Sequence, residues 1–370
     1  MKQRLLIFVY IMLLGALVAC EGQGPDSGDG EQLSGDITLM ANRTLIRANG
    51  SDCASLVVLL TDESGMIHDV TADAEIYCGD STEPMATATF TTPSAGDFSF
   101  YALYGMAISN DVEVKAVAGI SDLPADSNKE STDFAHRLLL IQHTGTACPN
   151  CPKLMNTLKL VAEDEAYAGR YYHIASHSYN TDDKAYSSAA ANLSGALGVK
   201  SYPWLNFNFV AANGYLGEEA DIKNCLDLFH EERAAVAIAA SSNIIDGVIY
   251  ANVGVKAAEA ANYFVGVWVL EDNIHSTQSS ATASWQNNHN NCLRGMAGES
   301  KNERIYGHNI GRVESGATSN VIMAVEVDND WYTPNCKLLV FVTTDDGKGN
   351  LELVNSTLCP VNGGVAYSYN

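Results

Sequence analysis

Cys148 and Cys151 are the residues of this chain whose type and spacing most directly support chemistry, since they are separated only by a Pro-Asn dipeptide. Two thiols this close can open and close as a disulfide. A thiolate attacks a disulfide through a mixed intermediate, and a second nearby thiol then resolves it. Two other interpretations stay open: a static disulfide that staples a turn, and a metal site completed by His143 or His177.

The residues around this motif predict the elements that position it. An apolar run at 138–141 predicts a buried strand before the motif, and apolar residues recur at helical spacing over 154–161 after it. The N-terminus of a helix stabilises a thiolate, so we predict that Cys148 is the nucleophile and Cys151 the shielded resolving thiol. If the helix begins at Cys148, Pro152 forfeits one of its hydrogen bonds, and we expect an irregular first turn.

Further elements follow in an alternating order. Residues 171–175 predict a second strand, an Ala-rich stretch at 184–197 predicts a helix, and residues 204–209 open a hairpin. A final helix is expected over 218–233. The order is therefore strand, Cys-x-x-Cys, helix, strand, helix, hairpin, helix.

This order resembles that of thioredoxins. It is similar, more closely, to a family of outer-membrane lipoproteins of Bacteroidetes known from a 28-kDa surface protein, in which a thioredoxin-like domain precedes a β-domain. The resemblance covers roughly residue 133 to the C-terminus. The stretches that carry it are 143–152 (HTGTACPNCP), 201–207 (SYPWLNF), 268–272 (WVLED) and 289–295 (HNNCLRG).

The resemblance implies roles for particular residues. It places a cis proline, Pro203, at the start of the strand that faces the cysteines, and so adds Pro203 to the catalytic candidates. Tyr202, Pro149 and Asn150 become candidates for substrate contact. The family is associated with surface adhesion or receptor roles, which implies an alternative in which the thioredoxin-like frame is only a scaffold.

The start of the chain predicts export. Two basic residues precede a fourteen-residue apolar stretch, which is too short to favour a spanning helix. Small residues before Cys20 form a lipobox pattern, so we expect a signal peptide at 1–19 and a lipid on Cys20. Residues 20–35 are rich in Gly and acidic residues, which is typical of a flexible tether. We therefore expect an outer-membrane lipoprotein on the periplasmic face or the cell surface.

Alternating patterns flank the central domain. Short strands separated by turn signals over 36–119 predict an immunoglobulin-like β-sandwich, and 120–133 reads as a polar linker. With a thioredoxin-like α/β domain at 134–233 and a second β-sandwich at 234–370, the predicted fold is multidomain, α/β plus all-β.

The remaining cysteines suggest structural pairings in a disulfide-permissive compartment. Cys53 and Cys78 fall in the same predicted sandwich. Cys336 and Cys359 lie symmetrically about a predicted hairpin turn at 345–350, and would face each other if the register is symmetrical. Two more cysteines remain, as a pair or as buried free thiols: Cys225 and Cys292.

The net charge of the chain limits the classes of partner that it is expected to bind. The 370 residues carry a formal net charge of −23, which repels phosphate backbones and excludes nucleic acid as an expected partner. No motif points to a cofactor or a metal, and we expect the membrane to be met through the lipid anchor only. Two functions remain: thiol-disulfide exchange on envelope or surface proteins, and surface binding or adhesion without catalysis.

Overall fold

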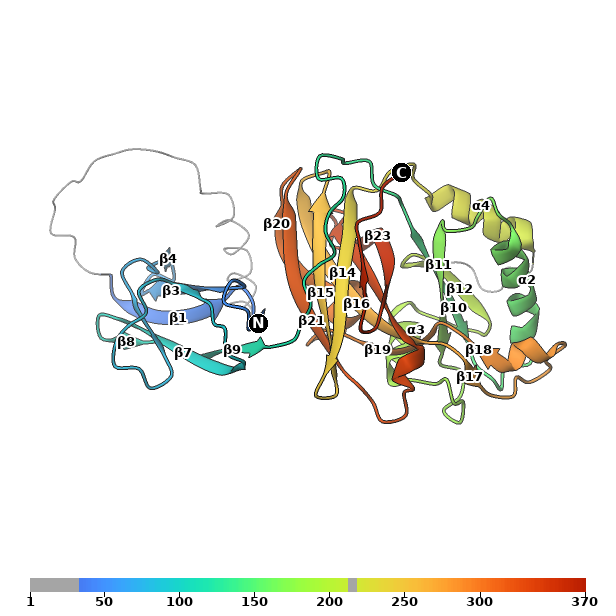
Figure 1. The fold of residues 1–370 in the computed structure, drawn as a ribbon, viewed down its shortest axis with the longest axis horizontal. Coiled ribbons are helices and arrows are strands. Elements are labelled where there is room, and N and C mark those ends of the chain that lie inside the picture. Colours follow the sequence, from blue (N-terminus) through green and yellow to red (C-terminus); the bar gives the residue numbers. More distant parts are fainter. Residues whose placement is uncertain (1–32, 212–217) are drawn as a thin grey trace. The chain divides into compact units, whose positions relative to one another are not determined.

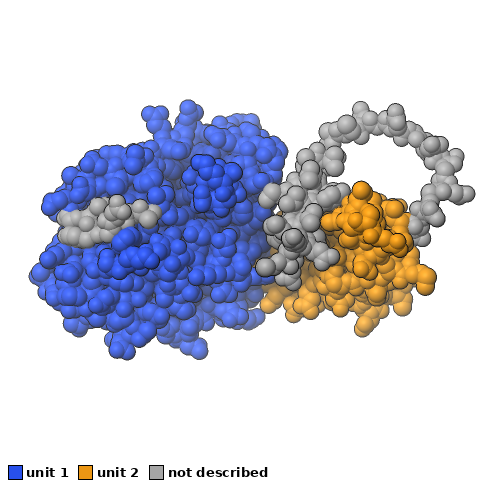
Figure 2. Space-filling view, turned by 180° about the vertical axis from the view of Figure 1, so that it is seen from behind, with its two compact units in different colours: residues 1–15, 121–370 blue, residues 16–120 orange. Residues whose placement is uncertain are grey.

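The computed structural model describes residues 33–211 and 218–370 (Figure 1). The chain divides into two compact units, Ala16–Ile120 and a second that contains Ser121–Asn370, coloured separately in Figure 2. The predicted signal peptide and Cys20 lie outside the described residues, as does most of the predicted tether. Within the described part, no helix is long and apolar enough to cross a bilayer.

The first unit is built from two β-sheets that face each other. One sheet has the order β1-β3-β4 with β6 paired to β3, and the other has the order β2-β9-β7-β5 with β8 paired to β7. Apolar side chains from both sheets, including Leu39, Leu60 and Phe100, form one buried core. The strands are β1 Gly35–Ala41, β2 Leu45–Arg47, β3 Ala54–Asp62, β4 Ile67–Asp69, β5 Glu75–Cys78, β6 Thr89–Phe90, β7 Gly96–Tyr104, β8 Ala107–Ile108 and β9 Val112–Val117.

The predicted pairing of Cys53 with Cys78 is wrong, since both thiols are free. Cys53 directly precedes β3, whereas Cys78 ends β5, and these strands belong to opposite sheets of the sandwich. Cys78 instead lies opposite Phe100 of β7. The two cysteines share a domain, but the topology assigns them to different layers.

The second unit is organised around a nine-stranded sheet. Its order is β13-β12-β10-β11-β19-β16-β22-β23, with β20 also paired to β16. Strands on both sides of the predicted domain boundary at 234 join this sheet, because β11 pairs with β19 at Ala175 and Cys292. Its strands are β10 Leu138–Thr144, β11 Tyr171–His177, β12 Trp204–Phe207, β13 Val210–Ala211, β16 Ala261–Glu271, β19 Cys292–Met296, β20 His308–Val313, β22 Cys336–Asp345 and β23 Leu351–Pro360.

Helices cover the part of this sheet formed by β10, β11 and β12 (Figure 1). Leu138 and Leu140 of β10 pack with α2 and α4, while Leu139 and Ile141 face the core that contains α3. Because β10 is buried on both faces, the first part of its sequence is a continuous apolar run. The helices are α2 Cys151–Glu163, α3 Ser188–Ala196, α4 Glu219–Phe229 and α5 Lys301–Tyr306.

The C-terminal part of the unit is a second sandwich. Strands β16 and β22 of the long sheet pack against a four-stranded sheet with the order β21-β15-β14-β24, and the core between them is apolar. The predicted linker at 120–133 runs along this sheet, where the Lys256 ammonium contacts the Asp126 carboxylate at 3.1 Å. The further strands are β14 Val236–Ile245, β15 Val248–Ala257, β21 Thr318–Glu326 and β24 Gly364–Val365.

The predicted hairpin around 345–350 forms, but its register is not symmetrical. Cys359 lies opposite Leu338, and Cys336 lies opposite Glu271 of β16. A shift in register between Val342 and Thr343 offsets the strands. The predicted Cys336–Cys359 disulfide is therefore wrong, and both thiols are free and buried.

Candidate functional site

The Cys-x-x-Cys motif lies between the end of β10 and the start of α2. The helix begins at Cys151, not at Cys148, and Asn150 is its N-cap residue without a side-chain cap bond. Pro152 therefore occupies the first turn, where a missing N–H costs no helical hydrogen bond. The irregular first turn that a helix start at Cys148 would have required is therefore not needed.

Cys148 and Cys151 are joined in a disulfide with their Cα atoms 5.5 Å apart. Both residues are buried, at 1% and 0% exposure, although Ala147, Pro149 and Asn150 around them are exposed. The closed disulfide is compatible with exchange chemistry and with a static staple. Both cysteines are closed to solvent in this conformation.

One side of the motif is held by the loop between β11 and α3. The backbone N–H groups of Ser178 and Tyr179 donate to the Thr144 carbonyl at 3.0 and 3.2 Å. A Cβ at Gly145 would lie 2.5 Å from the Tyr179 Cβ, so only glycine fits at this point. The Asp183 carboxylate accepts a hydrogen bond from the Thr146 N–H at 2.8 Å.

Asp183 is the centre of this anchor. It is 4% exposed, and its Oδ2 also lies 2.7 Å from the Nδ1 of buried His177. Burial alone would raise the pKa of Asp183, but the hydrogen bonds from His177 and from the backbone of Ala185 and Thr146 outweigh it and lower the pKa to about 2. A stable carboxylate thus fixes the segment that leads into Cys148.

The other side of the motif is held by residues 276–287, between β17 (Ile274–His275) and β18 (Asn288–His289). The Ser279 N–H donates to the Thr146 carbonyl at 2.7 Å. The buried Gln278 amide donates to the Cys148 carbonyl at 3.0 Å. Asp183 and Gln278 were not predicted from the sequence, since both lie in polar stretches with no periodicity.

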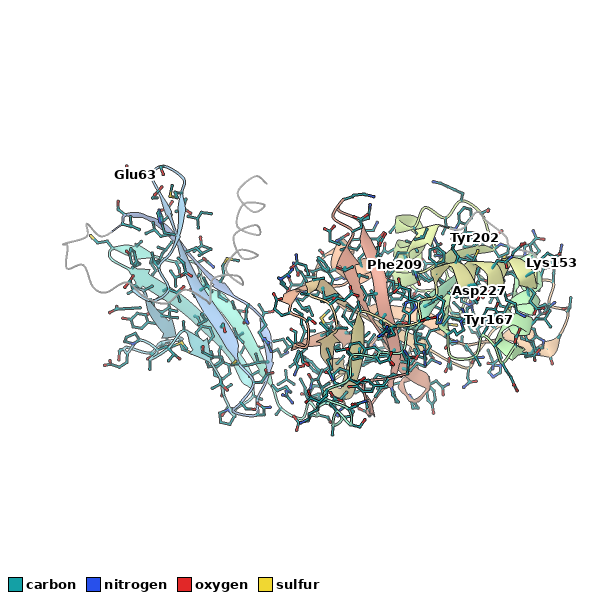
Figure 3. The ribbon with its side chains drawn as sticks, turned by 90° about the horizontal axis from the view of Figure 1, so that it is seen from above. Glu63, Lys153, Tyr167, Tyr202, Phe209 and Asp227 are labelled. Atoms are coloured by element: carbon teal, nitrogen blue, oxygen red, sulfur yellow. A yellow bond between two sulfur atoms is a disulfide. The ribbon has the colours of Figure 1, made fainter. Side chains whose placement is uncertain are left out.

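The proline loop lies at the same edge of the sheet as the motif. β12 runs antiparallel to β10, and Trp204 at its start lies opposite His143 near the end of β10. The Tyr202–Pro203 peptide bond just before it is cis, as the family resemblance implied. Tyr202, which is labelled in Figure 3, is half-buried. Its hydroxyl lies 3.0 Å from that of Ser178, and its ring is edge-on to that of Tyr179.

His143 is a structural residue of the sheet. Its Nδ1 lies 2.7 Å from the Ser194 hydroxyl and its Nε2 lies 3.0 Å from the Asn206 side-chain oxygen. Burial lowers the pKa of His143 to about 4, so the ring is neutral at pH 7. The other histidine of the metal interpretation, His177, is likewise engaged, with Asp183.

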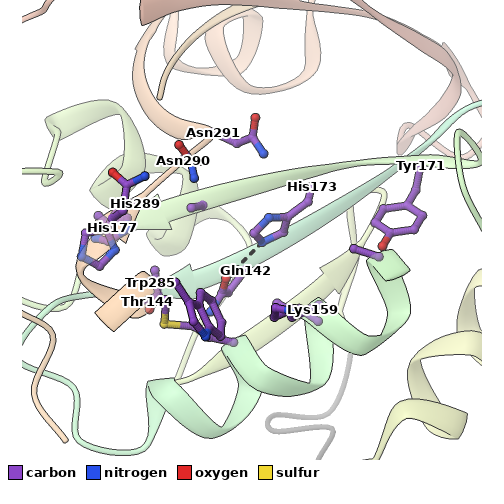
Figure 4. A pocket seen from close by; sticks show the side chains of 15 residues that line it. Gln142, Thr144, Lys159, Tyr171, His173, His177, Trp285, His289, Asn290 and Asn291 are labelled. Atoms are coloured by element: carbon purple, nitrogen blue, oxygen red, sulfur yellow. Dashed lines mark hydrogen bonds between the residues drawn. The ribbon is translucent and has the colours of Figure 1, made fainter. Parts of the chain in front are cut away.

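A cavity of about 380 Å³ lies beside α2, between the helix, the sheet and the 285–291 stretch (Figure 4). Its wall includes Trp285 and His173, whose Nε2 lies 3.0 Å from the Gln142 side-chain oxygen. Burial, with smaller effects from the charges of His177 and Lys337, lowers the pKa of His173 to about 4. The exposed area of the walls is mainly apolar, and the lining also includes the charged Lys159.

The two C-terminal stretches of the family resemblance lie on neighbouring strands. Leu270 of β16 lies opposite Leu293 of β19, which connects both to β11. Arg294 is buried, and its guanidinium contacts Glu271 at 3.1 Å and Asp330 at 2.7 Å. These residues join the two halves of the unit.

The last two cysteines do not pair. Cys292 is fully buried on β19, and Cys225 is half-buried on α4. Burial is also the main reason why the pKa of the Cys292 thiol is well above its ordinary value. Of the two alternatives, the structure therefore supports free thiols.

Comparison with known proteins shows a likeness of fold. No family model matches the chain, and no curated protein matches it. A solved structure, HBP35 of Porphyromonas gingivalis, a bacterium of the Bacteroidetes, superposes with a TM-score of 0.52 at 15% identity over 63% of this chain and 77% of that one. The surface layer protein SbsC (15% identity, 34% of this chain and 59% of that one) and the Yersinia pseudotuberculosis adhesin InvE (10%, 90% and 61%) reach TM-scores of only 0.18 and 0.17, and carry no argument.

Proposed function

We propose that this chain is an envelope lipoprotein with a thioredoxin-like domain that exchanges disulfides with envelope or surface proteins through Cys148 and Cys151. The observation that carries the proposal is the position of the Cys148–Cys151 disulfide at the start of α2, at the sheet edge where the cis Tyr202–Pro203 bond also lies. The strand and helix order from β10 to α4 supports the thioredoxin-like assignment. The likeness to the Porphyromonas gingivalis structure supports the fold.

The exchange proceeds in two steps. A partner thiolate attacks the Cys148 sulfur, the Cys148–Cys151 bond breaks, and Cys151 leaves as a thiolate. A second partner thiolate then attacks the mixed disulfide, forms the partner's own disulfide and releases Cys148 as a thiolate. Two electrons pass from the partner to this chain, and the two partner thiols release their protons to solvent. The reverse sequence reduces a partner disulfide.

Two features of the helix start assist this chemistry. The motif lies at the N-terminus of α2, where the positive end of the helix dipole favours a thiolate. Cys151 is the first residue of the helix and is fully buried, which suits a resolving thiol. Cys148 lies outside the helix, beside the exposed Pro149, and therefore takes the role of the attacking thiol.

A partner trap tests the proposal. Cys151→Ser in the full chain leaves Cys148 free to form a mixed disulfide that has no resolving thiol. The purified variant, incubated with a protein that carries an exposed disulfide, should form an adduct that reductant releases, whereas the Cys148→Ser/Cys151→Ser variant should form none. Absence of the adduct, together with no exchange by the wild-type chain, would contradict the proposal.

A second function has its own supporting observation. Cys148 is only 1% exposed, which suits a disulfide that stabilises a scaffold. In this alternative the chain is a surface binding or adhesion lipoprotein, anchored through Cys20, in which the thioredoxin-like frame is only a scaffold. Retention of partner binding after removal of both motif cysteines would favour it.

A further inference from the structure

The 276–287 segment interrupts a small sheet and contacts the motif. β17 and β18 pair directly, with His275 opposite Asn288, so the twelve intervening residues are not needed to join the strands. They include a short 3₁₀ helix at Ser284–Asn287. The segment is distant from the motif in sequence, by about 130 residues, so its contacts there are tertiary.

Gln278 provides the first set of contacts. It is 2% exposed, and its Nε2 lies within hydrogen-bond range of three motif carbonyls: Cys148 at 3.0 Å, Thr146 at 3.2 Å and Gly145 at 3.4 Å. The amide has two hydrogens, so it donates to two of these carbonyls at a time, and the Cys148 carbonyl is the nearest. The carbonyl of the proposed nucleophile is therefore bound directly by the segment.

Gln286 provides the second set. It is fully buried, and its Nε2 donates to the Pro152 carbonyl at 2.9 Å and to the Asn156 side chain at 3.1 Å. Its Oε1 accepts from the Thr282 N–H at 2.6 Å, which fixes the segment's own conformation. The two glutamines thus bridge the disulfide turn on either side of Cys151.

The Gln278 side chain also gives the closed state a weakness. Its Oε1 is buried and has no hydrogen-bond partner among the described residues. A buried acceptor without a partner is unfavourable, and it would be hydrated once the segment moved away. The segment is therefore held by several hydrogen bonds, but one of its own polar atoms favours opening.

We propose that the 276–287 segment is an intramolecular cover that controls the access of thiols to the Cys148–Cys151 disulfide. The inference deepens the proposed function and rests on it for its biological meaning. Attack on a disulfide requires the thiolate to approach in line with the S–S bond. Both cysteines are closed to solvent, and the segment is hydrogen-bonded to the Cys148 and Pro152 carbonyls on either side of Cys151. Local opening of the segment, without global unfolding, admits the partner.

The first test removes the cover. Because His275 pairs with Asn288, a two-residue Asn-Gly turn can replace residues 276–287 and keep the hairpin. Dithiothreitol provides the thiols: one attacks and breaks the Cys148–Cys151 bond, the other closes the oxidised reagent, and both cysteines are released as thiols. The reduction rate is followed by alkylation and mass spectrometry of the full chain.

The expected result is a reduction rate at least about ten-fold above wild type, since the closing hydrogen bonds are lost. Thr277→Ala, at an exposed position of the same segment, should leave the rate unchanged. An unchanged rate in the shortened chain, with its circular dichroism spectrum intact, would overturn the proposal.

A second variant keeps the test decisive if the shortened chain does not fold. Gln278→Glu preserves the side chain's size but places an oxygen against three carbonyl oxygens, and should raise the rate about ten-fold. Equal rates for Gln278→Glu and wild type would overturn the cover. Dithiothreitol is a small thiol, so its reaction tests the cover separately from exchange with proteins. If the variants are reduced faster by dithiothreitol but the chain exchanges no disulfides with proteins, the cover stands and only the proposed function is contradicted.

Discussion

Two cysteine pairs in the second unit, Cys148–Cys151 and Cys336–Cys359, were both candidates for disulfides, and only the first forms one. The first pair is brought together by a single turn, so its geometry depends on four consecutive residues. The second depends on the register of two long strands, and an offset in that register separates the thiols. The short spacing of Cys148 and Cys151 therefore predicts a disulfide correctly. The symmetry of Cys336 and Cys359 about a hairpin turn does not.

The surroundings of the two pairs also differ. Tertiary contacts hold the Cys148–Cys151 turn from two sides, through Asp183 and through Gln278. The Cys336 and Cys359 thiols instead belong to the apolar core between two sheets. The first pair is therefore set in a frame of polar contacts, and the second in an apolar core.

The largest effect should come from breaking the polar frame. Asp183→Ala leaves His177 and the Thr146 N–H without their buried acceptor, and should lower the free energy of unfolding by about 3 kcal/mol. The measurement is urea denaturation followed by circular dichroism. Asp182→Ala, at the exposed neighbouring position, is the matched control and should change little. Equal losses for the two variants would show that the frame is not anchored at Asp183.

A reductant should lower the free energy of unfolding through the Cys148–Cys151 pair and not through the Cys336–Cys359 pair, and this effect should be smaller than that of Asp183→Ala. Opening the Cys148–Cys151 disulfide removes a short loop constraint and should lower the free energy of unfolding by about 2 kcal/mol. Reductant should cause the same loss in the Cys336→Ala/Cys359→Ala variant, which keeps the disulfide. The Cys148→Ala/Cys151→Ala variant should not respond to reductant. A reductant response that depends on Cys336 or Cys359 would restore the hairpin disulfide.

The buried His143, at the end of the strand that leads into the motif, should also make stability depend on pH. The pKa of His143 is lowered to about 4 when folded, against about 6.5 when unfolded, so the unfolded state binds more protons between these values. The contribution of this residue to stability is therefore complete well above pH 6.5 and is lost as the pH falls toward 4. His143→Gln should flatten this part of the urea-midpoint profile. An unchanged slope would mean that His143 is not the titrating group.

The smallest effect concerns how fast the free thiols of Cys336 and Cys359 are alkylated. Burial, with the charge of Glu271, raises the pKa of Cys336 to about 12, and burial raises that of Cys359 to about 11. At pH 8 in the native chain both should resist iodoacetamide, while the part-buried Cys53 is alkylated. Peptide mass spectrometry after a timed reaction measures this order. Rapid labelling of Cys336 would contradict its place in the core.

Local patterns predicted the elements of the site well. The apolar run before the motif forms β10, and the residues at helical spacing after it form α2. Both patterns arise directly from burial, on two faces for the strand and on one face for the helix. The anchors at Asp183 and Gln278 could not be predicted, since each acts on the motif across a loop whose path the local sequence does not encode. The continuous sheet across residue 234 was missed for the same reason, as β11 meets β19 only through tertiary pairing.

The most direct test of the central claim is the reduction potential of the Cys148–Cys151 disulfide in the full chain. Equilibration with defined thiol-disulfide buffers, followed by alkylation and mass spectrometry, measures it. A disulfide that exchanges with envelope proteins should have a potential above about −300 mV, in the range of thiol-disulfide oxidoreductases. A value below about −300 mV would identify a structural staple and contradict the proposed exchange.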